Sequence, residues 1–278
     1  MNVVLIFGAR RTGTTLLNQI LCNDPDANAH VGECQLLTRM LGSFRWATTN
    51  YDRVVQWYFD DYEGCRDLFR RQIDDFLRVS AAHFGGVENL VLKNPEMSRF
   101  KAEIDVLMPT AKQVICVRDP RDQIVSELDV GKRQAERGMD GDAAKAFKNR
   151  DVAGLAKKYT SYYAPMLSGE PENSMFVRYE DVIQALEPTL RKIEKFTGLD
   201  LSQYDPDSEW KRFEHKEHIR KMPAYVEQYG SALDASRVGR FRETLTEKEV
   251  ETIDAICAEP LAKFYGGRMH SDDRVHGR

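Results

Sequence analysis

The sequence predicts an α/β fold, a three-layer α/β/α sandwich with a central parallel sheet. Three observations predict it: short apolar runs rich in β-branched residues, amphipathic helical patterns between those runs, and a glycine-bearing turn directly after the first run. Strands that alternate with helices favour a parallel sheet with helices packed on its faces. A turn between a strand and a helix start is also suited to binding an anion.

Four apolar runs are the expected strands. They are nearly continuous in apolar residues, which is typical of strands buried on both faces of a parallel sheet. The runs are residues 3–7, 90–92, 113–117 and 175–178.

Helical patterns lie between and after these runs. Residues 66–84 and 186–199 carry apolar side chains at helical spacing. Thr246 and Glu249 have the spacing of a capping box, and Pro260 is expected to kink or split the helix that follows. The apolar face of the first of these helices is formed by Phe69, Ile73, Phe76, Leu77 and Phe84.

The chain length suits one compact domain, which we expect over residues 1–267 of 278. It includes a helical excursion at about residues 35–88. Two polar stretches, about 134–156 and 202–237, are expected to be loops or excursions over the sheet edge. The tail 268–278 has little apolar surface to bury, and we expect it to be disordered.

Composition excludes several classes of protein. The formal net charge is −4, whereas a general nucleic-acid binder is expected to be basic. No apolar stretch approaches the ~20 residues of a membrane span. Five cysteines without regular spacing indicate reduced thiols, and no metal-binding spacing occurs. The N-terminus also lacks the features of a signal peptide. We therefore expect a cytoplasmic protein without a metal site.

The stretch "GARRTGTTLL" (8–17) has the glycines of a phosphate-binding loop, Gly8 and Gly13. Where a nucleoside-triphosphate loop places Lys and then Ser or Thr, this chain has two threonines. Without the lysine, a triphosphate and its metal are poorly held, but Arg11 within the loop can reach a single phosphate. The alternative is an ordinary strand–turn–helix with surface arginines.

A second polar segment, "RDPRDQIVS" (118–126), follows the third expected strand. Asp119 is a natural helix N-cap, and proline fits the first helical position after it. This leaves Arg118 and Ser126 unexplained. Arg118 ends a strand at the edge where open α/β sheets bind ligands. A guanidinium with a nearby hydroxyl suits a terminal phosphate.

These two segments together resemble the sulfotransferases that use 3′-phosphoadenosine 5′-phosphosulfate (PAPS). The family's (P/A)-(K/R)-(S/x)-G-T-T loop is similar to "ARRTGTT", and its R-D-(P/G)-R-(D/A)-x-x-x-S segment is similar to "RDPRDQIVS". Further likenesses are "VLKNP" (91–95), "FVRYEDV" (176–182), and "VGRFRETL" (238–245). An arginine in the loop and the Gly-Glu pair of "VGEC" (31–34) are closest to the tyrosylprotein sulfotransferase branch and its bacterial relatives.

The resemblance implies PAPS as donor, 3′-phosphoadenosine 5′-phosphate (PAP) as product and a P-loop-like phosphosulfate-binding loop. Arg11 would neutralise the leaving phosphate in an in-line displacement. Lys93 would reach the transferring sulfuryl group, although Asn94 replaces the aspartate that the family has beside this lysine. The residues that would cradle the phosphosulfate are Arg10, Arg11, Thr12, Gly13, Thr14 and Thr15.

The same resemblance implies a second phosphate site. Arg118 and Ser126 would bind the 3′-phosphate, supplemented by Arg237 and Arg240. Tyr179 would pack near the adenine; the alternative is a buried tyrosine with a bonded hydroxyl.

The acceptor hydroxyl needs a base. Glu33 is the candidate by resemblance, and His30 in the same loop is the rival. The acceptor-binding side would lie in the excursion at about 35–88. The sequence leaves four kinds of acceptor open: a peptide tyrosine, a sugar hydroxyl, a lipid headgroup and a small phenol. The aromatic residues Trp46, Trp57, Tyr58 and Phe59 suit an acceptor pocket, but packing into the core is the interpretation we favour.

Two other functions share this fold. A P-loop kinase of a small metabolite would use the same turn, but the missing lysine opposes it. A catalytically degenerate nucleotide-binding protein would keep the fold without the chemistry.

Overall fold

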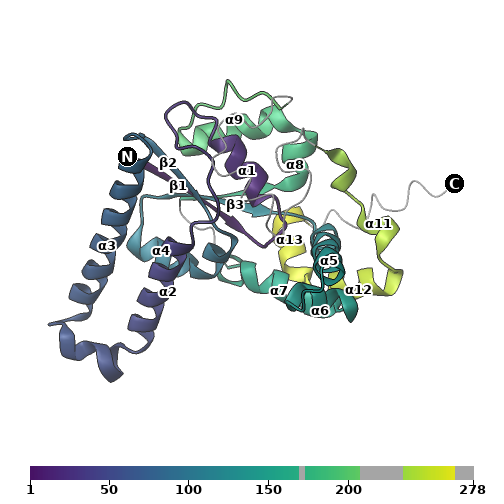
Figure 1. Cartoon of the computed structure of the whole chain (residues 1–278), viewed down its shortest axis with the longest axis horizontal. Coiled ribbons are helices and arrows are strands. Elements are labelled where there is room, and N and C mark those ends of the chain that lie inside the picture. Colours follow the sequence, from purple (N-terminus) through teal and green to yellow (C-terminus); the bar gives the residue numbers. More distant parts are fainter. Residues whose placement is uncertain (169–172, 207–233, 267–278) are drawn as a thin grey trace.

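The computed structural model describes residues 1–168, 173–206 and 234–266. A parallel sheet of four strands in the order β2-β1-β3-β4 lies at its centre (Figure 1). The strands are β1 (Asn2–Gly8), β2 (Asn89–Lys93), β3 (Lys112–Val117) and β4 (Ser174–Arg178). The predicted fold class is confirmed, and each predicted strand matches an observed one within a residue or two.

Alternate residues of each strand face two separate apolar cores. On β1, Leu5 and Phe7 belong to one core, whereas Val4 and Ile6 belong to the other. Every one of these four side chains is fully buried. Burial on both faces is the reason the strands are continuous apolar runs, because a sheet face open to water would tolerate polar residues.

Three helices cover the face that Val4 and Ile6 share: α1 (Thr14–Leu21), α8 (Tyr179–Gln184) and α9 (Leu186–Thr197). The other face is covered by α2 (Gln35–Thr49), α3 (Tyr62–His83), α4 (Lys101–Leu107), α5 (Pro120–Glu136), α7 (Val152–Tyr163), α12 (Glu247–Ile256) and α13 (Ala258–Tyr265). The remaining helices within the described residues are α6 (Asp142–Lys148) and α11 (Phe241–Thr244). Short turns are η1 (Tyr51–Val55), η2 (Gln56–Tyr58), η3 (Pro95–Phe100), η4 (Ala164–Met166) and η5 (Ala235–Arg237).

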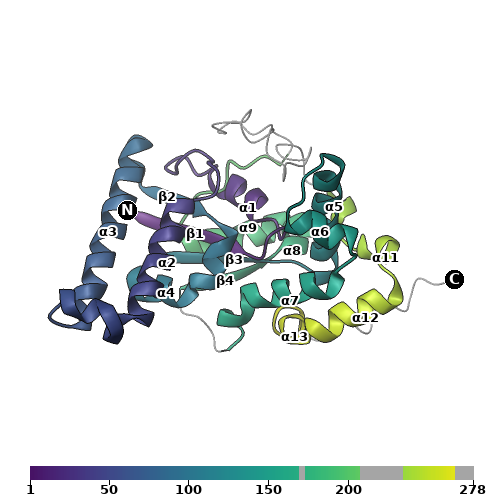
Figure 2. The same ribbon diagram turned by 60° about the horizontal axis from the view of Figure 1, so that its bottom comes forward.

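The helices α2 and α3 lie side by side in both views, next to the sheet edge formed by β2 (Figure 1, Figure 2). The predicted apolar face of α3 packs on the core, with Ile73 and Leu77 buried and Phe69 partly buried. The turns η1 and η2 join the two helices.

The C-terminal helices follow the predicted pattern. Thr246 and Glu249 form a capping box at the start of α12. The helical stretch is split at Cys257, and Pro260 lies in the first turn of α13. A proline is tolerated there because the first N–H groups of a helix have no partner within it.

The prediction of a loop at 134–156 is wrong, because most of this stretch is helical. It contains the end of α5, all of α6 and the start of α7. The physical reason is close packing: Ala144 of α6 is fully buried, and a Cβ on Gly131 of α5 would lie 2.1 Å from the Ala143 carbonyl oxygen. Two small residues thus let a polar helix pack on α5.

Most of the expected loop at 202–237 and all of the expected tail at 268–278 lie outside the described residues. Within the described ranges, no helix has the length and apolar composition needed to cross a membrane.

Candidate functional site

The loop between β1 and α1 has the backbone of a functional turn. Gly13 has a φ of 94°, and a Cβ there would lie 2.7 Å from the Tyr179 ring. Arg11 has a φ of 66°, a strained conformation that is concentrated at functional sites. Thr12 is buried and its hydroxyl donates to the carbonyl oxygen of Ala9 at 2.7 Å. The loop is therefore held in one conformation.

Neighbouring elements clamp this loop. The buried Tyr163 hydroxyl donates to the Cys116 carbonyl oxygen at 2.6 Å and accepts from the Ala9 N–H at 3.1 Å. Gln123 of α5 donates to the Arg10 carbonyl oxygen at 2.7 Å. Burial raises the pKa of Tyr163, so its hydroxyl stays protonated as this pair of bonds requires.

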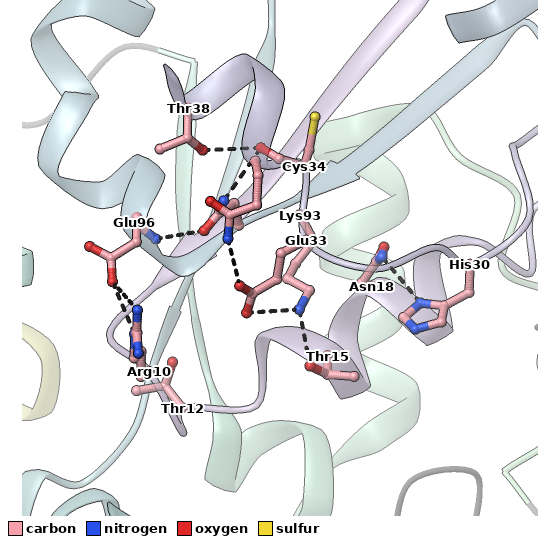
Figure 3. Close-up of polar contacts among 12 residues, drawn as sticks. Arg10, Thr12, Thr15, Asn18, His30, Glu33, Cys34, Thr38, Lys93 and Glu96 are labelled. Atoms are coloured by element: carbon pink, nitrogen blue, oxygen red, sulfur yellow. Dashed lines mark hydrogen bonds and ion pairs between the residues drawn. The ribbon is translucent and has the colours of Figure 1, made fainter. Parts of the chain in front are cut away.

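Lys93, at the end of β2, lies against the start of α1. Its Nζ is 3.2 Å from the Thr15 Oγ1 and 3.5 Å from the Glu33 Oε1 (Figure 3). Gln35 donates to the other oxygen of Glu33 at 3.2 Å. The lysine is only 5% exposed, and Thr14 beside it is buried. A buried ammonium, a hydroxyl and a carboxylate thus meet beside the loop.

The chain reaches this point because the segment before α2 is fixed along β2. The Asn28 side chain pairs with both backbone groups of Val91, at 2.6 and 3.1 Å. The Cys34 N–H donates to the Lys93 carbonyl oxygen at 2.8 Å. Asn94 donates to the Cys34 carbonyl oxygen at 3.3 Å. Asn94 therefore holds the backbone beside Glu33, while Glu33 and Thr15 hold the lysine.

His30 lies in the same segment but in a different environment. It is 3% exposed, and its Nδ1 is 3.2 Å from the Asn18 amide nitrogen (Figure 3). Burial, reinforced by the nearby Lys93 ammonium, lowers the pKa of His30 to about 3. A neutral imidazole paired inside the fold is a structural element, whereas Glu33 faces the lysine with a side chain that is 41% exposed.

Arg118, at the end of β3, connects the loop to a distant segment. Its Nη1 donates to the Arg11 carbonyl oxygen at 3.2 Å, and its Nη2 donates to the Arg237 carbonyl oxygen at 2.6 Å. The guanidinium lies 4.4 Å above the Tyr179 ring. Its Nε is buried without a hydrogen-bond partner. Tyr179 thus packs on both the loop and this arginine.

The start of α5 places Ser126 beside the loop. Asp119 caps the helix and Pro120 occupies its first position, as predicted. Two turns later, Ser126 accepts a hydrogen bond from the Arg11 Nε at 3.3 Å. The loop, the end of β3 and α5 therefore bring Arg11, Arg118 and Ser126 together.

The segment around η5 lies over α5. The Asp122 carboxylate accepts from the Gly239 N–H at 2.6 Å and fixes this segment to the helix. Arg237 is 3.7 Å from the Asp129 carboxylate, and Arg240 forms an ion pair with the same carboxylate. Two arginines therefore share one carboxylate next to Ser126.

Sequence reasoning missed Arg133. It lies on α5 seven residues after Ser126 and four after Asp129, hence on the same face of the helix. Its Nε and Nη2 are buried without a hydrogen-bond partner. Burial and the nearby Arg11 and Arg237 lower its pKa. The heptad spacing from Ser126 was the signal that the sequence offered.

Arg10 points elsewhere. Its Nε donates to the Glu96 Oε1 at 2.9 Å (Figure 3). The Tyr162 hydroxyl donates to the same oxygen at 2.5 Å, and the Arg99 Nε is 3.6 Å from the other. Burial raises the pKa of Glu96, but the bonds from Tyr162 and Arg10 outweigh it and lower the pKa. These four residues also line a large cavity.

The cavity has a volume of about 1690 Å³ and lies between α2, the η1–η2 turn, α3, η3 and α7. Trp46 and Tyr58 line it and are 59% and 82% exposed. Trp57 is 77% exposed. The favoured interpretation that Trp46, Trp57, Tyr58 and Phe59 pack into the core is wrong for the first three, because α2 and the turn after it extend past the sheet (Figure 1) and leave these side chains exposed. Phe59 is partly buried against Ala47, Val55 and Cys65.

The predicted residues thus form two neighbouring groups. Lys93, Glu33 and Thr15 lie on the β2 side of the loop, and Arg11, Arg118, Ser126 and Arg237 lie on the α5 side. Among the described residues, no group of three or more His, Cys, Asp or Glu is arranged to hold a metal ion.

Comparisons with known proteins agree with this architecture. The sequence profile of the family described as "Sulfotransferase family" matches residues 3–203. A solved "Sulfotransferase Domain from the Curacin Biosynthetic Pathway" superposes with a TM-score of 0.51 at 14% identity, covering 92% of this chain and 97% of that one. A "Sulfotransferase Domain from the Synechococcus PCC 7002 Olefin Synthase" gives 0.50 at 15%, covering 92% and 94%. No curated protein matches.

The pH dependence of stability tests the structural role of His30. The unfolded chain binds a proton at this residue below its ordinary pKa of 6.5, whereas the folded protein binds one only near 3. Stability is therefore full above pH 6.5 and falls as the pH drops toward 3, by up to about 1.4 kcal/mol per pH unit. We expect urea unfolding of wild type to show this loss between pH 7 and pH 5, and His30→Gln to show much less. The exposed His83→Gln is the control; a His30→Gln variant with the pH dependence of wild type would contradict the assignment.

Proposed function

The chain belongs to the sulfotransferase family, and on that premise we propose that it transfers a sulfuryl group from PAPS to an acceptor hydroxyl by in-line displacement. The observation that carries this proposal is Arg118 with its surroundings. A buried guanidinium joins the phosphate loop to Arg237 and keeps one buried nitrogen without a partner. Buried polar groups are nearly always bonded, so this nitrogen is suited to donate to the acceptor oxygens of a phosphate.

The donor fits the two groups of residues. Its 5′-phosphosulfate suits the loop, where backbone N–H groups and a helix start meet Arg11. Its 3′-phosphate suits Arg118, Ser126 and Arg133, which combine a hydroxyl with guanidinium nitrogens that have no other partner. PAPS would supply the activated sulfuryl group, and the protein would supply position and charge.

The positions of three residues support their proposed catalytic roles. Lys93 would place its ammonium next to the transferring group, because Thr15 of the loop's helix holds it. Glu33 would take the proton from the acceptor hydroxyl, with Gln35 and Lys93 fixing its two oxygens. Arg11 would stabilise the charge that develops on the leaving phosphate.

The acceptor would enter from the α2–α3 side, through the cavity that ends at Arg10 and Gln35. Gln35 links the two regions, because it lines the cavity and donates to Glu33. The five cysteines are free, which supports a reducing compartment such as the cytoplasm.

Calorimetry without magnesium tests the donor. We expect PAP to bind at least tenfold more tightly than ADP, since ADP lacks the 3′-phosphate that Arg118 and Ser126 would hold. Equal affinities, or a requirement for magnesium, would refute the two-phosphate site. PAP and ADP have the same base and differ in the position of the second phosphate, so the comparison isolates the contribution of the 3′-phosphate.

Glu33→Gln tests the base. The amide keeps the shape and the bond to Lys93 but cannot accept the acceptor proton, so turnover should fall by about 10²–10⁴-fold. The affinity for PAP should stay within about twofold of wild type. Measuring both in one preparation separates chemistry from folding. A Glu33→Gln enzyme with normal turnover would remove Glu33 from the mechanism.

Arg133→Ala tests the arginine that lies beyond the recognised motifs. PAP affinity should fall about tenfold or more while ADP affinity is unchanged, because only the 3′-phosphate would contact this side chain. The unliganded protein should melt no lower than wild type, since the substitution removes a cation from a cluster of cations. Lys132→Ala, the exposed neighbour, is the control. Parallel losses for PAP and ADP would argue against the assignment.

A further inference from the structure

One face of α2 forms a wall of the cavity, and its polarity changes along the helix. The lining residues recur every three or four positions: Gln35, Thr38, Arg39, Gly42, Ser43 and Trp46. This is the spacing of a single helical stripe. From Gln35 to Trp46 the helix rises about 16 Å. The stripe starts with amide, hydroxyl and guanidinium groups beside the catalytic residues and ends with an indole.

The opposite wall of the cavity shows the same change from polar to apolar side chains. Glu96 and Arg99 of η3 line the polar part. Phe100, at the end of η3, lies so close to Gly42 that a Cβ on this glycine would be in ordinary van der Waals contact with the Phe100 ring. The far part is lined by Val54, Val55, Tyr58, Phe59, Leu68 and Phe69. Both walls therefore pass from polar to apolar with distance from Glu33.

The polar part carries excess positive charge. Four basic side chains and two carboxylates line the cavity, although the chain as a whole has a net charge of −4. Glu96 is already paired with Arg10 and Arg99. Arg39 and Lys158 form no ion pair with any described residue. A local excess of cations in an acidic protein favours an anionic ligand.

The apolar part argues against a peptide. A peptide brings an N–H and a carbonyl with every residue, and each needs a partner when buried. The far part of the cavity is lined by hydrocarbon and aromatic side chains that offer few such partners. Its volume of about 1690 Å³ also exceeds what a small phenol fills, since pockets for drug-sized ligands measure about 300–1,000 Å³.

We propose that the acceptor is an anionic amphiphile, with its hydroxyl at Glu33, a negative group at Arg39, which lies one helical turn after Gln35, and an apolar body against Trp46 and Tyr58. This inference rests on the proposed sulfotransferase function and names the class of acceptor that the same site takes. Arg39 and Trp46 are then specificity-determining residues rather than catalytic ones.

Three tyrosine derivatives test the proposal with PAPS as donor. N-dodecanoyl-L-tyrosine has the phenol, the carboxylate and an apolar tail; its methyl ester lacks the charge, and N-acetyl-L-tyrosine lacks the tail. We expect kcat/KM for sulfate transfer to be about tenfold or more higher for the first than for either of the others. An acidic tyrosine-containing peptide is the fourth substrate.

Variants assign each preference to a residue. Arg39→Ala should raise KM for the dodecanoyl acid about tenfold and leave KM for its methyl ester unchanged. Trp46→Ala should lower kcat/KM for both dodecanoyl compounds and not for N-acetyl-L-tyrosine. Matched controls are Arg53→Ala, an exposed arginine outside the cavity lining, and Leu36→Ala, a 58% exposed residue of α2 outside that lining. All four should bind PAP like wild type.

The outcomes separate this inference from the function it rests on. Equal transfer to the acid and its ester, better transfer to N-acetyl-L-tyrosine or the peptide, or no transfer to any tyrosine compound while PAP binds more tightly than ADP would overturn the acceptor class alone. An Arg39→Ala effect on acid and ester alike would do the same. Failure to bind PAP in preference to ADP would instead refute the proposed function.

Discussion

The placement of one buried cation determines the arrangement of the site. Arg118 ends β3, is 6% exposed and donates to the backbone of both Arg11 and Arg237. A charge with so little access to water is costly unless it is paired. Here its hydrogen-bond partners are two carbonyl oxygens, its guanidinium lies over the Tyr179 ring, and the nearby carboxylates of Asp122 and Glu180 offset part of its charge. The loop conformation, the position of η5 and the packing of α8 on the loop all depend on this guanidinium.

The charges around Arg118 are also closely spaced. Arg11, Arg133 and Arg237 lie near one another, and Asp129 is shared between Arg237 and Arg240. Like charges held close together oppose folding, and such arrangements are typical of sites built for a ligand rather than for stability. Asp122 offsets part of this cost by fixing the backbone at Gly239 to α5. Backbone contacts thus help to hold this part of the molecule together, and Arg237 and Arg240 are in addition paired with Asp129.

The sequence was sufficient for features with a local cause. Buried strands appear as continuous apolar runs, and the capping box at Thr246 and the cap at Asp119 depend on residues three positions apart or fewer. Features that depend on distant segments were not predictable in the same way. The stretch 134–156 is polar, and part of it is a packed helix because Gly131 lets Ala143 and Phe147 approach α5 closely while Ala144 is buried. Trp46 is a large aromatic residue of the kind often found in a core, but its exposure depends on how far α2 extends past the sheet. Arg133 matches no motif, and only the structure shows that its Nε and Nη2 are buried without a hydrogen-bond partner.

On the proposed function, the donor and acceptor sides are built by different physical means and meet at a short contact. The donor side uses strand ends, a helix start and an arginine that bonds to backbone carbonyl oxygens. The acceptor side uses side chains along α2 and the η1–η2 turn, among them the exposed Trp46 and Tyr58. Between them, Gln35 belongs to the cavity wall and also bonds Glu33, whose other oxygen faces Lys93. Because this contact is fixed by the backbone bond from Cys34 to Lys93, side chains farther along α2 can change without moving the carboxylate. A fold of this kind can exchange acceptors while its chemistry stays in place, which is why the acceptor must be inferred from the polarity of the cavity and not from the motifs that bind the donor.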